Sequence, residues 1–283
     1  MPAGRQEAKQ SLVLNTTHSM KNPIITLLTD FGTRDYYVAS MKGVILNINP
    51  DCTIVDMTHD VRPHDIIEGA FLLANAYSYF PKGTIHLSVV DPGVGGTRRP
   101  ILLVTPSYFF VGPDNGLFGF VTQRERVKQV VVLTRREYFL RGVSMTFHGR
   151  DIFAPVAAHL SLGVKPGAFG HKTKSLKRLG IRRPIVRDGK LSGEILHIDA
   201  FGNLISNIDG EKLFQFIRGR PFVIRVGGKA IHELKRGYWE GKKGEPIGLI
   251  GSGGFLEFSI REGNAQKILK AKRGDPIEIS TKS

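Results

Sequence analysis

Residues 89–99, VVDPGVGGTRR, join an apolar run to an acid, a glycine-rich turn and two arginines. The groups with chemistry are the carboxylate of Asp91, which can accept hydrogen bonds and protons, and the guanidinium of Arg98, which only donates. Glycines after a strand can cradle a phosphate, but such loops read G-x-x-x-x-G-K-[ST], or G-x-G-x-x-G at the start of a helix. Here Pro100 and another apolar run follow, so no helix N-terminus is available to a phosphate. The glycines therefore predict a close approach of the backbone to a polar site.

A reactive histidine lies in the segment 144–160, SMTFHGRDIFAPVAAHL. His148 comes just before a predicted helix whose start is marked by Asp151, with Pro155 tolerated near its first turn. A histidine at the mouth of a helix is a better catalytic candidate than one on an apolar helix face, such as His159. We predict a catalytic role for His148, with a hydrogen bond to its own loop as the alternative.

A metal site is a second possibility, because His59, Asp60 and His64 are close in sequence. No H-E-x-x-H or similar ligand spacing is present, so we expect no metal and no other cofactor. The single cysteine, Cys52, excludes an internal disulfide framework and a cysteine-based zinc site. It begins a predicted strand, where a buried and inert thiol is expected.

The elements that would position these side chains alternate between short apolar runs and amphipathic segments. Predicted strands cover 24–29, 52–57, 84–90 and 129–133, a hairpin covers 101–105 and 108–112 before a PDNG turn at 113–116, and predicted helices cover 36–48, 65–79 and 151–162.

This alternation predicts an α/β domain over residues 23–172, with a mostly parallel sheet and helices on both faces. Ligands of open α/β sheets bind at the carboxyl ends of the strands. Asp30, Asp60 and Asp91 lie at or just after such ends. We therefore expect a site at this edge.

The pattern changes in the C-terminal part of the chain. Short strand-like segments separated by glycine turns predict a smaller all-β domain over residues 191–283, a barrel or a sandwich. These segments are 192–199, 203–208, 221–226, 247–250, 254–260 and 276–280.

The chain of 283 residues has a net charge of +15, and this charge is unevenly distributed. We predict a basic linker at 173–190, because the stretch 172–190 combines many Lys and Arg with Pro184 and Gly180. Basic and aromatic residues do not interleave there as in single-strand binders, so we consider a nucleic-acid partner unlikely. We expect a flexible tail at 1–22, with Met20 as an alternative start.

The expected cellular compartment follows from two signals that the sequence lacks, a membrane span and a secretory signal. No run reaches the about 18 apolar residues of a membrane span, and the N-terminal residues lack the apolar core of a secretory signal. We expect a cytoplasmic protein without a membrane partner.

Five motifs taken in order resemble the S-adenosyl-L-methionine hydroxide adenosyltransferase family, which is related to the fluorinase and the chlorinase. They are TDFGTRDYY, VDPGVG with TRR, PDNGL, TFHGRDIF and HIDAFGNLISNI, and the resemblance runs from about residue 23 to residue 280. It implies hydrolysis of S-adenosyl-L-methionine to adenosine and L-methionine without a metal or redox cofactor. It also implies a triad of Asp91, Arg98 and His148 that orients and activates water.

The resemblance assigns substrate contacts and a quaternary structure as well. It implies a homotrimer, with each site between one subunit's N-terminal domain and a neighbour's C-terminal domain. Two positions depart from the fluorinase, which has an arginine where this chain has Gly253 and a tryptophan where it has His64. The implied substrate-binding residues are Asp30 at the ribose hydroxyls, Asp35, Asp199 and Ser252 near the methionine portion, and Phe201 and Asn203 at adenine.

Two alternatives remain beside hydrolysis: a chlorinase-like halogenase, and a non-catalytic module that binds a nucleoside or nucleic acid. The fluorinase has a tyrosine where Asp91 stands, and Tyr-Ser in place of His148-Gly149. A carboxylate 4 Å from a halide would repel it by about 4 kcal/mol at an effective dielectric near 20. Halogenation is therefore the less favoured prediction.

Overall fold

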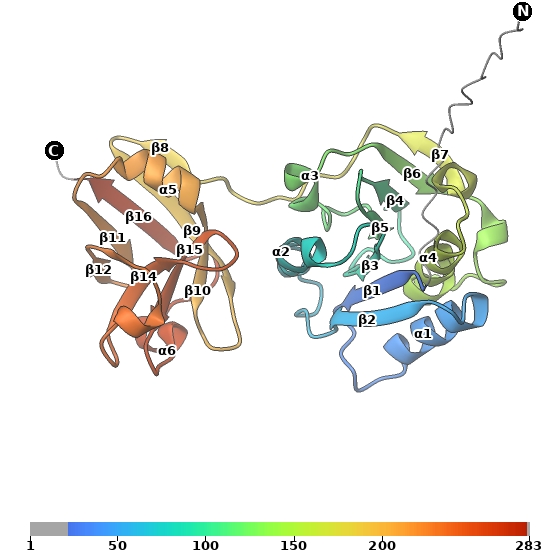
Figure 1. Ribbon diagram of the computed structural model, residues 1–283, viewed down its shortest axis with the longest axis horizontal. Coiled ribbons are helices and arrows are strands. Elements are labelled where there is room, and N and C mark those ends of the chain that lie inside the picture. Colours follow the sequence, from blue (N-terminus) through green and yellow to red (C-terminus); the bar gives the residue numbers. More distant parts are fainter. Residues whose placement is uncertain (1–21, 282–283) are drawn as a thin grey trace, which may run out of the picture.

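The structure is a computed structural model that describes residues 22–281, so the predicted tail with Met20 lies outside the described residues apart from Asn22. Two domains are joined by an extended segment (Figure 1). The N-terminal domain holds the side chains predicted to react, and the C-terminal domain holds most of those predicted to bind substrate.

The N-terminal domain is built on a seven-stranded sheet with the order β2-β1-β3-β5-β4-β6-β7. Pairing is parallel from β2 to β5 and antiparallel from β5 to β7. As a result β2, β1, β3, β5 and β6 point one way, while β4 and β7 oppose them, which confirms the predicted mostly parallel sheet. The strands are β1 (Ile24–Thr29), β2 (Thr53–Thr58), β3 (Ile85–Val89), β4 (Pro100–Val104), β5 (Phe109–Pro113), β6 (Gln129–Leu133) and β7 (Gly170–Thr173).

Helices cover both faces of this sheet, as predicted (Figure 1). On one face α1 (Tyr37–Ile48) and α4 (Ala154–Ser161) pack in a buried core with β1 and β3. On the other, α2 (Ile66–Ala76) and α3 (Val121–Arg124) form a second core. Single turns complete the domain: η1 (Tyr77–Tyr79), η2 (Arg136–Tyr138), η3 (Gly149–Phe153) and η4 (Pro166–Phe169).

The helix predicted from residue 151 begins differently in the structure. A π-helical turn, η3, precedes α4, and Pro155 lies at the start of α4. Proline has no N–H to donate, so the carbonyl of Asp151 is free and accepts from Leu140 N–H at 2.9 Å instead. Such wide turns are often found at functional sites. This one directly follows His148.

The C-terminal domain is a nine-stranded sheet that curls into a nearly closed barrel around its own core. The order is β12-β11-β16-β9-β10-β15-β14-β13, with β8 on β9, and the contact of β12 with β14 nearly closes the curl. The strands are β8 (Ile185–Arg187), β9 (Lys190–Ile198), β10 (Leu204–Asp209), β11 (Phe222–Val226), β12 (Lys229–Ile231), β13 (Leu234–Lys235), β14 (Pro246–Ile250), β15 (Phe255–Ile260) and β16 (Pro276–Thr281).

The barrel-like prediction is confirmed, but the domain also contains helical segments that we did not predict. These are α5 (Gly210–Ile217), η5 (Tyr238–Glu240) and α6 (Ala265–Leu269). Asp209 caps α5 by accepting from Lys212 N–H at 2.7 Å. Short helices of this kind fit between strands and leave intact the pattern of strand-like segments separated by glycine turns that predicted an all-β domain.

The basic segment between the domains is anchored to the PDNG turn. The Asp114 carboxylate pairs with Arg99 and also accepts from Lys177 N–H at 2.8 Å. Arg99 in turn donates to Ser175 O at 2.8 Å. The start of the segment is therefore tied to the strand that leaves the glycine-rich turn.

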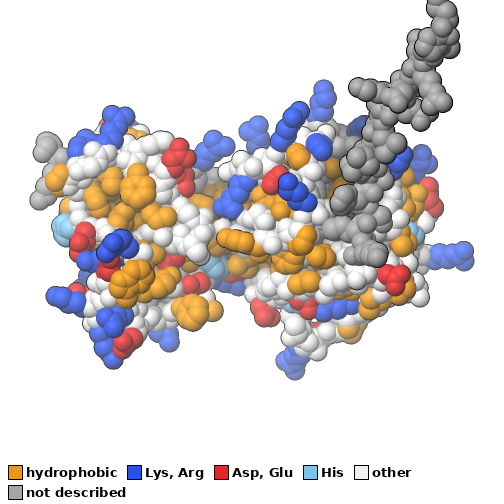
Figure 2. Space-filling view, in the orientation of Figure 1, with side chains coloured by type: hydrophobic (Ala, Val, Ile, Leu, Met, Phe, Trp, Pro, Cys, Tyr) orange, Lys and Arg blue, Asp and Glu red, His pale blue; other side chains and the backbone are white. Residues whose placement is uncertain are grey.

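Figure 2 shows Lys and Arg side chains distributed over the visible face, interspersed with acidic and uncharged ones. No single continuous basic patch stands out on that face. Within residues 22–281 no helix has the length and apolar character needed to cross a membrane.

We predict that Asp114→Ala lowers the free energy of unfolding by about 3 kcal/mol, because the Arg99 cation loses its carboxylate and the Lys177 N–H loses its acceptor. Chemical denaturation of both proteins measures this. Glu278→Ala is the control, because Glu278 pairs with Lys190 at 3.0 Å on the exposed surface and exposed pairs contribute little. Equal effects of the two substitutions would contradict the anchoring role of Asp114.

Candidate active site

Asp91, Arg98 and His148 meet at the carboxyl end of β3. Arg98 Nε lies 3.0 Å and 2.9 Å from the two carboxylate oxygens of Asp91, and its Nη2 also contacts Asp91. The same Nη2 lies 2.7 Å from Nδ1 of His148. The side chains of Asp91 and Arg98 are only 4% and 9% exposed, so this is a buried ion pair with an imidazole bound to it.

The contact with Arg98 fixes which nitrogen of His148 carries a proton. A guanidinium only donates, so Nδ1 must accept, and a neutral ring then carries its hydrogen on Nε2. Burial lowers the pKa of His148, and the Arg98 cation lowers it further, against weaker opposite effects of Asp91 and Asp151. Both arguments give a neutral imidazole at neutral pH that offers Nε2–H as a donor.

The glycine-rich turn lets two backbones touch beside this cluster. Gly95 has φ +74°, and a Cβ at this residue would lie 2.2 Å from the carbonyl oxygen of Met145. Only glycine combines that conformation with that contact. The expected close approach is thus between residues 91–98 and the segment that carries His148. Phe153 supports the cluster, with its ring 5.3 Å from the Arg98 guanidinium carbon.

The PDNG turn, which we predicted only as a turn, also holds the end of β3. Asn115 donates from Nδ2 to the carbonyl of Val90 at 2.8 Å, and its Oδ1 accepts from Leu117 N–H at 3.2 Å. This fixes the backbone next to Asp91. The sequence offered the motif but not its partner, which lies 25 residues away.

Asp30 lies at the same edge of the sheet, at the end of β1. Its carboxylate accepts from the backbone N–H of His64 at 2.8 Å. The adjacent Phe31 packs edge-on against Phe147, with ring centroids 5.9 Å apart, and this connects the Asp30 segment to the His148 segment. Asp35 is exposed and precedes α1.

The predicted residues of the C-terminal domain line a separate cavity of about 700 Å³. Asp199 holds its own loop, because its carboxylate accepts from Phe201 N–H at 2.9 Å and from Asn203 N–H at 2.8 Å. The ring of Phe201 is 78% exposed at the cavity. Ser252 lies in the turn between β14 and β15 on the same cavity wall.

Several polar residues of this cavity escaped the sequence analysis. Glu257 is buried on β15 and accepts from Tyr238 and Ser259 hydroxyls, each at 2.8 Å. Burial, followed by this contact with Glu257, raises the pKa of Tyr238 to about 12. His197 also lines the cavity. The available signal was a charged or titratable residue inside an apolar strand, Glu257 in FLEFSI and His197 in EILHI.

The predicted site is therefore in two parts within one chain. The N-terminal domain contributes only Phe71, Leu72 and Asn75 to the cavity wall. The cavity lining contains none of the predicted N-terminal residues, which are Asp30, Asp35, Asp91, Arg98 and His148.

His59, one of the two histidines considered for a metal site, has other neighbours. His59 is buried, with Nδ1 2.9 Å from the hydroxyl of Thr29 and Nε2 3.0 Å from the carboxylate of Asp56. In the part of the chain that the structure describes, no three His, Cys, Asp or Glu side chains converge on a point that could hold a metal ion.

Comparisons with known proteins found relatives that cover most of this chain. An (R)-S-adenosyl-L-methionine hydrolase from Methanocaldococcus jannaschii is 38% identical over 90% of this chain and 95% of its own length. A fluorinase from Actinoplanes is more distant, at 30% identity over 66% of this chain and 72% of its own. A crystal structure of an uncharacterized conserved protein from Thermotoga maritima superposes with a TM-score of 0.84 at 37% identity, over 90% of this chain and 99% of that one.

The family models match both domains: the SAM hydroxide adenosyltransferase N-terminal domain over residues 25–170 and its C-terminal domain over residues 193–278. The chain belongs to the SAM hydroxide adenosyltransferase family.

Proposed function

We propose that this chain hydrolyses S-adenosyl-L-methionine to adenosine and L-methionine. The observation that carries this proposal is the buried cluster of Asp91, Arg98 and His148 at the carboxyl edge of the sheet. It occurs in a chain whose curated relatives at 35–38% identity over most of its length are named hydrolases of this compound.

The reaction is a substitution at ribose C5′. The oxygen of water forms a bond to C5′ as the C5′–S bond breaks, sulfur takes the electron pair, and a neutral thioether leaves as methionine. One proton of the attacking water stays on the new 5′-hydroxyl, and the other passes to a base and then to solvent. Because a hydroxide-like nucleophile and a sulfonium neutralise each other, an enclosed site that excludes water favours the transition state. Most of the catalytic effect then comes from in-line placement of one water.

The hydrogen bonds of the cluster favour Asp91 as the group that accepts this proton. Nδ1 of His148 is occupied by Arg98 and its Nε2 carries a hydrogen, so the neutral ring can donate to the water oxygen but not accept from it. Asp91 binds Arg98 through both oxygens, yet a carboxylate has about four acceptor positions and retains room for one more. Arg98 fixes the orientation of both groups.

Substrate contacts complete the proposal. We assign Asp30 to the ribose hydroxyls, Asp35, Asp199 and Ser252 to the methionine portion, and Phe201 and Asn203 to adenine. We further propose a homotrimer in which the cavity of one subunit faces the Asp91 cluster of a neighbour, because the two halves of the site do not share a cavity within one chain. A cytoplasmic location is proposed from the single thiol, which is buried.

The names of the curated hydrolases suggest the configuration of the substrate, since they carry the prefix (R). The letter L already specifies the α-carbon of methionine, so we take the prefix to describe the sulfonium sulfur, which is bonded to the reacting carbon. Inversion at sulfur exchanges the methyl group with the methionine arm. A site that binds arm and ribose together distinguishes the two epimers, and we propose the (R)-sulfonium form as the preferred substrate.

The argument against halogenation changes with the structure. An isolated carboxylate would repel a halide, but Arg98 neutralises Asp91 across a direct ion pair. The repulsion is therefore smaller than the carboxylate alone would give. What disfavours a halide is that the Arg98 cation is already neutralised by Asp91, so this pair offers no net positive charge to bind it.

We predict that the purified protein converts the (R)-sulfonium epimer to adenosine and L-methionine about tenfold or more faster than the (S) epimer. Chromatography of the products, with and without chloride, measures this, and Asp91→Ala in the chloride-free reaction serves as the control for contaminating hydrolytic activity. Formation of 5′-chloroadenosine would replace hydrolysis with halogenation. No turnover together with tight RNA or DNA binding would favour the non-catalytic module.

We predict that turnover falls on the acid side only below the usual histidine pKa of about 6.5, because burial and Arg98 keep His148 neutral to lower pH. A protonated ring could not accept from Arg98 and would place a second cation against it. His148→Ala should lower kcat by about 10²-fold with little change in KM. His148→Asn keeps an acceptor and a donor but does not titrate, so its profile should lose the acid limb. An unchanged acid limb in His148→Asn would contradict this role.

We predict that Asp91→Ala and Asn203→Ala chains, each inactive alone, recover about one quarter of wild-type activity when refolded together in equal amounts, because random trimers combine two intact half-sites at that frequency. The matched control mixes Asp91→Ala with His148→Ala, whose lesions lie in the same half-site, and stays inactive. If the site lay within one chain, neither mixture would regain activity.

A further inference from the structure

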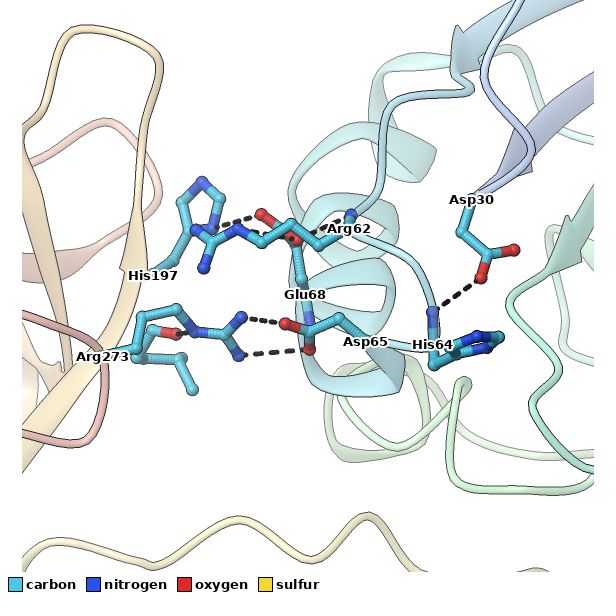
Figure 3. A network of polar contacts seen from close by, with 8 residues as sticks. Asp30, Arg62, His64, Asp65, Glu68, His197 and Arg273 are labelled. Carbon is cyan, nitrogen blue, oxygen red and sulfur yellow. Dashed lines mark hydrogen bonds and ion pairs between the residues drawn. The ribbon is translucent and has the colours of Figure 1, made fainter.

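Cross-domain contacts converge on the first turns of α2 (Figure 3). Arg273, between α6 and β16 of the C-terminal domain, pairs with both carboxylate oxygens of Asp65. One turn further along α2, Glu68 lies 3.5 Å from Nδ1 of His197, a polar contact without a hydrogen bond, and burial lowers the pKa of this histidine. The His197 ring stacks on Phe71, with ring centroids 4.9 Å apart.

Asp65 has two functions in this network. Its Oδ1 accepts from Glu68 N–H at 3.0 Å and so caps α2, while Arg273 binds the same carboxylate from the other domain. Burial alone would raise the pKa of Asp65, but the hydrogen bonds from Arg273 and from the Glu68 N–H lower it below the usual value. Arg273 is itself fixed, since its Nε donates to the carbonyl of Leu196 at 2.9 Å. The pair is mostly buried, with 19% and 21% of the two side chains exposed.

The residue before Asp65 holds Asp30 (Figure 3). His64 donates its backbone N–H to Asp30 Oδ2 at 2.8 Å. To do so it adopts φ +67°, a left-handed conformation that is costly for a residue with a side chain. Such a conformation persists only where neighbouring contacts enforce it. The neighbouring contacts here include the bond to Asp30 and the next residue, Asp65, which Arg273 anchors.

We propose that Arg273, acting through Asp65 and the backbone of His64, is a positioning residue for the Asp30 carboxylate that binds the ribose hydroxyls. This inference rests on the proposed function, because it uses the ribose role of Asp30. It differs from a purely structural role of the ion pair, which would hold the two domains together without affecting what Asp30 recognises.

Asp65→Asn separates the capping of α2 from the binding of Arg273. Asparagine is as good a helix cap as aspartate, so the bond from Glu68 N–H is kept, whereas the charge that binds Arg273 is lost. Arg273→Lys is the second variant, because lysine keeps the positive charge but cannot bind Asp65 and the Leu196 carbonyl in the same fork. Asp209→Asn is the matched control: Asp209 caps α5 in the same way and lies outside the network.

The readout is discrimination between S-adenosylmethionine and its 2′-deoxyribose analogue, measured as the ratio of kcat/KM. A substrate hydroxyl bound to a carboxylate should give wild type a preference on the order of 10²-fold. We expect Asp65→Asn and Arg273→Lys to reduce this preference to about tenfold or less, by slowing the intact substrate more than the deoxy analogue, which offers Asp30 only its 3′-hydroxyl. Asp209→Asn should keep the wild-type preference. The Kd values of adenosine and 2′-deoxyadenosine provide the same ratio for any variant that folds but turns over too slowly.

A double-mutant cycle with Asp30→Asn completes the test. If Arg273 acts through Asp30, Asp65→Asn should not change the ribose preference further once Asp30 is replaced. A wild-type preference retained in Asp65→Asn and Arg273→Lys, even with lower stability, would overturn the positioning role and leave the proposed function intact. A wild-type protein that hydrolyses both substrates equally well would refute the ribose role of Asp30, and the inference with it.

Discussion

The site depends on one interaction, the buried ion pair between Asp91 and Arg98. Removing two charges from water is expensive, and the cost is offset only when geometry and further hydrogen bonds are good. Here the guanidinium binds both oxygens of the carboxylate and still donates to His148, so each group limits the freedom of the other two. Three other features of the N-terminal domain lie around this contact. Asn115 fixes the strand end, Gly95 allows the second segment to approach, and the π-helical turn follows His148.

The sequence was sufficient to single out three residues that the structure brings together, because each has a local signature. Asp91 ends an apolar strand, Arg98 follows a glycine-rich turn, and His148 precedes a helix. The alternation of strands and helices likewise predicted the α/β sheet, and the glycine-separated strands predicted the β domain. Both predictions concern order along the chain, which local patterns encode directly.

What the sequence could not provide were contacts between distant residues. Nothing local pairs Asn115 with Val90 or Arg273 with Asp65, whose separations are 25 and 208 residues. The π-helical turn was missed, and the Asp151 carbonyl that Pro155 leaves free within it is satisfied from Leu140, outside the helix. The electrostatic argument about halides failed in the same way, since it treated Asp91 as an isolated charge. Arg98 lies beside Asp91 in space and neutralises its carboxylate, which the argument from an isolated charge did not take into account.

The pairing also bears on how such sites can diverge. Arginine stays protonated, so a descendant that lost the acid at the end of β3 would keep an enclosed cation with no internal counterion. The vacancy would attract a small anion from solution. Loss of the acid at residue 91 would thus change the proposed ligand of this pocket. In place of a neutral water molecule, the pocket would admit an anion from solution. In this chain the counterion of the guanidinium is fixed to the backbone; without it, the charge would be balanced only by an ion that arrives by diffusion.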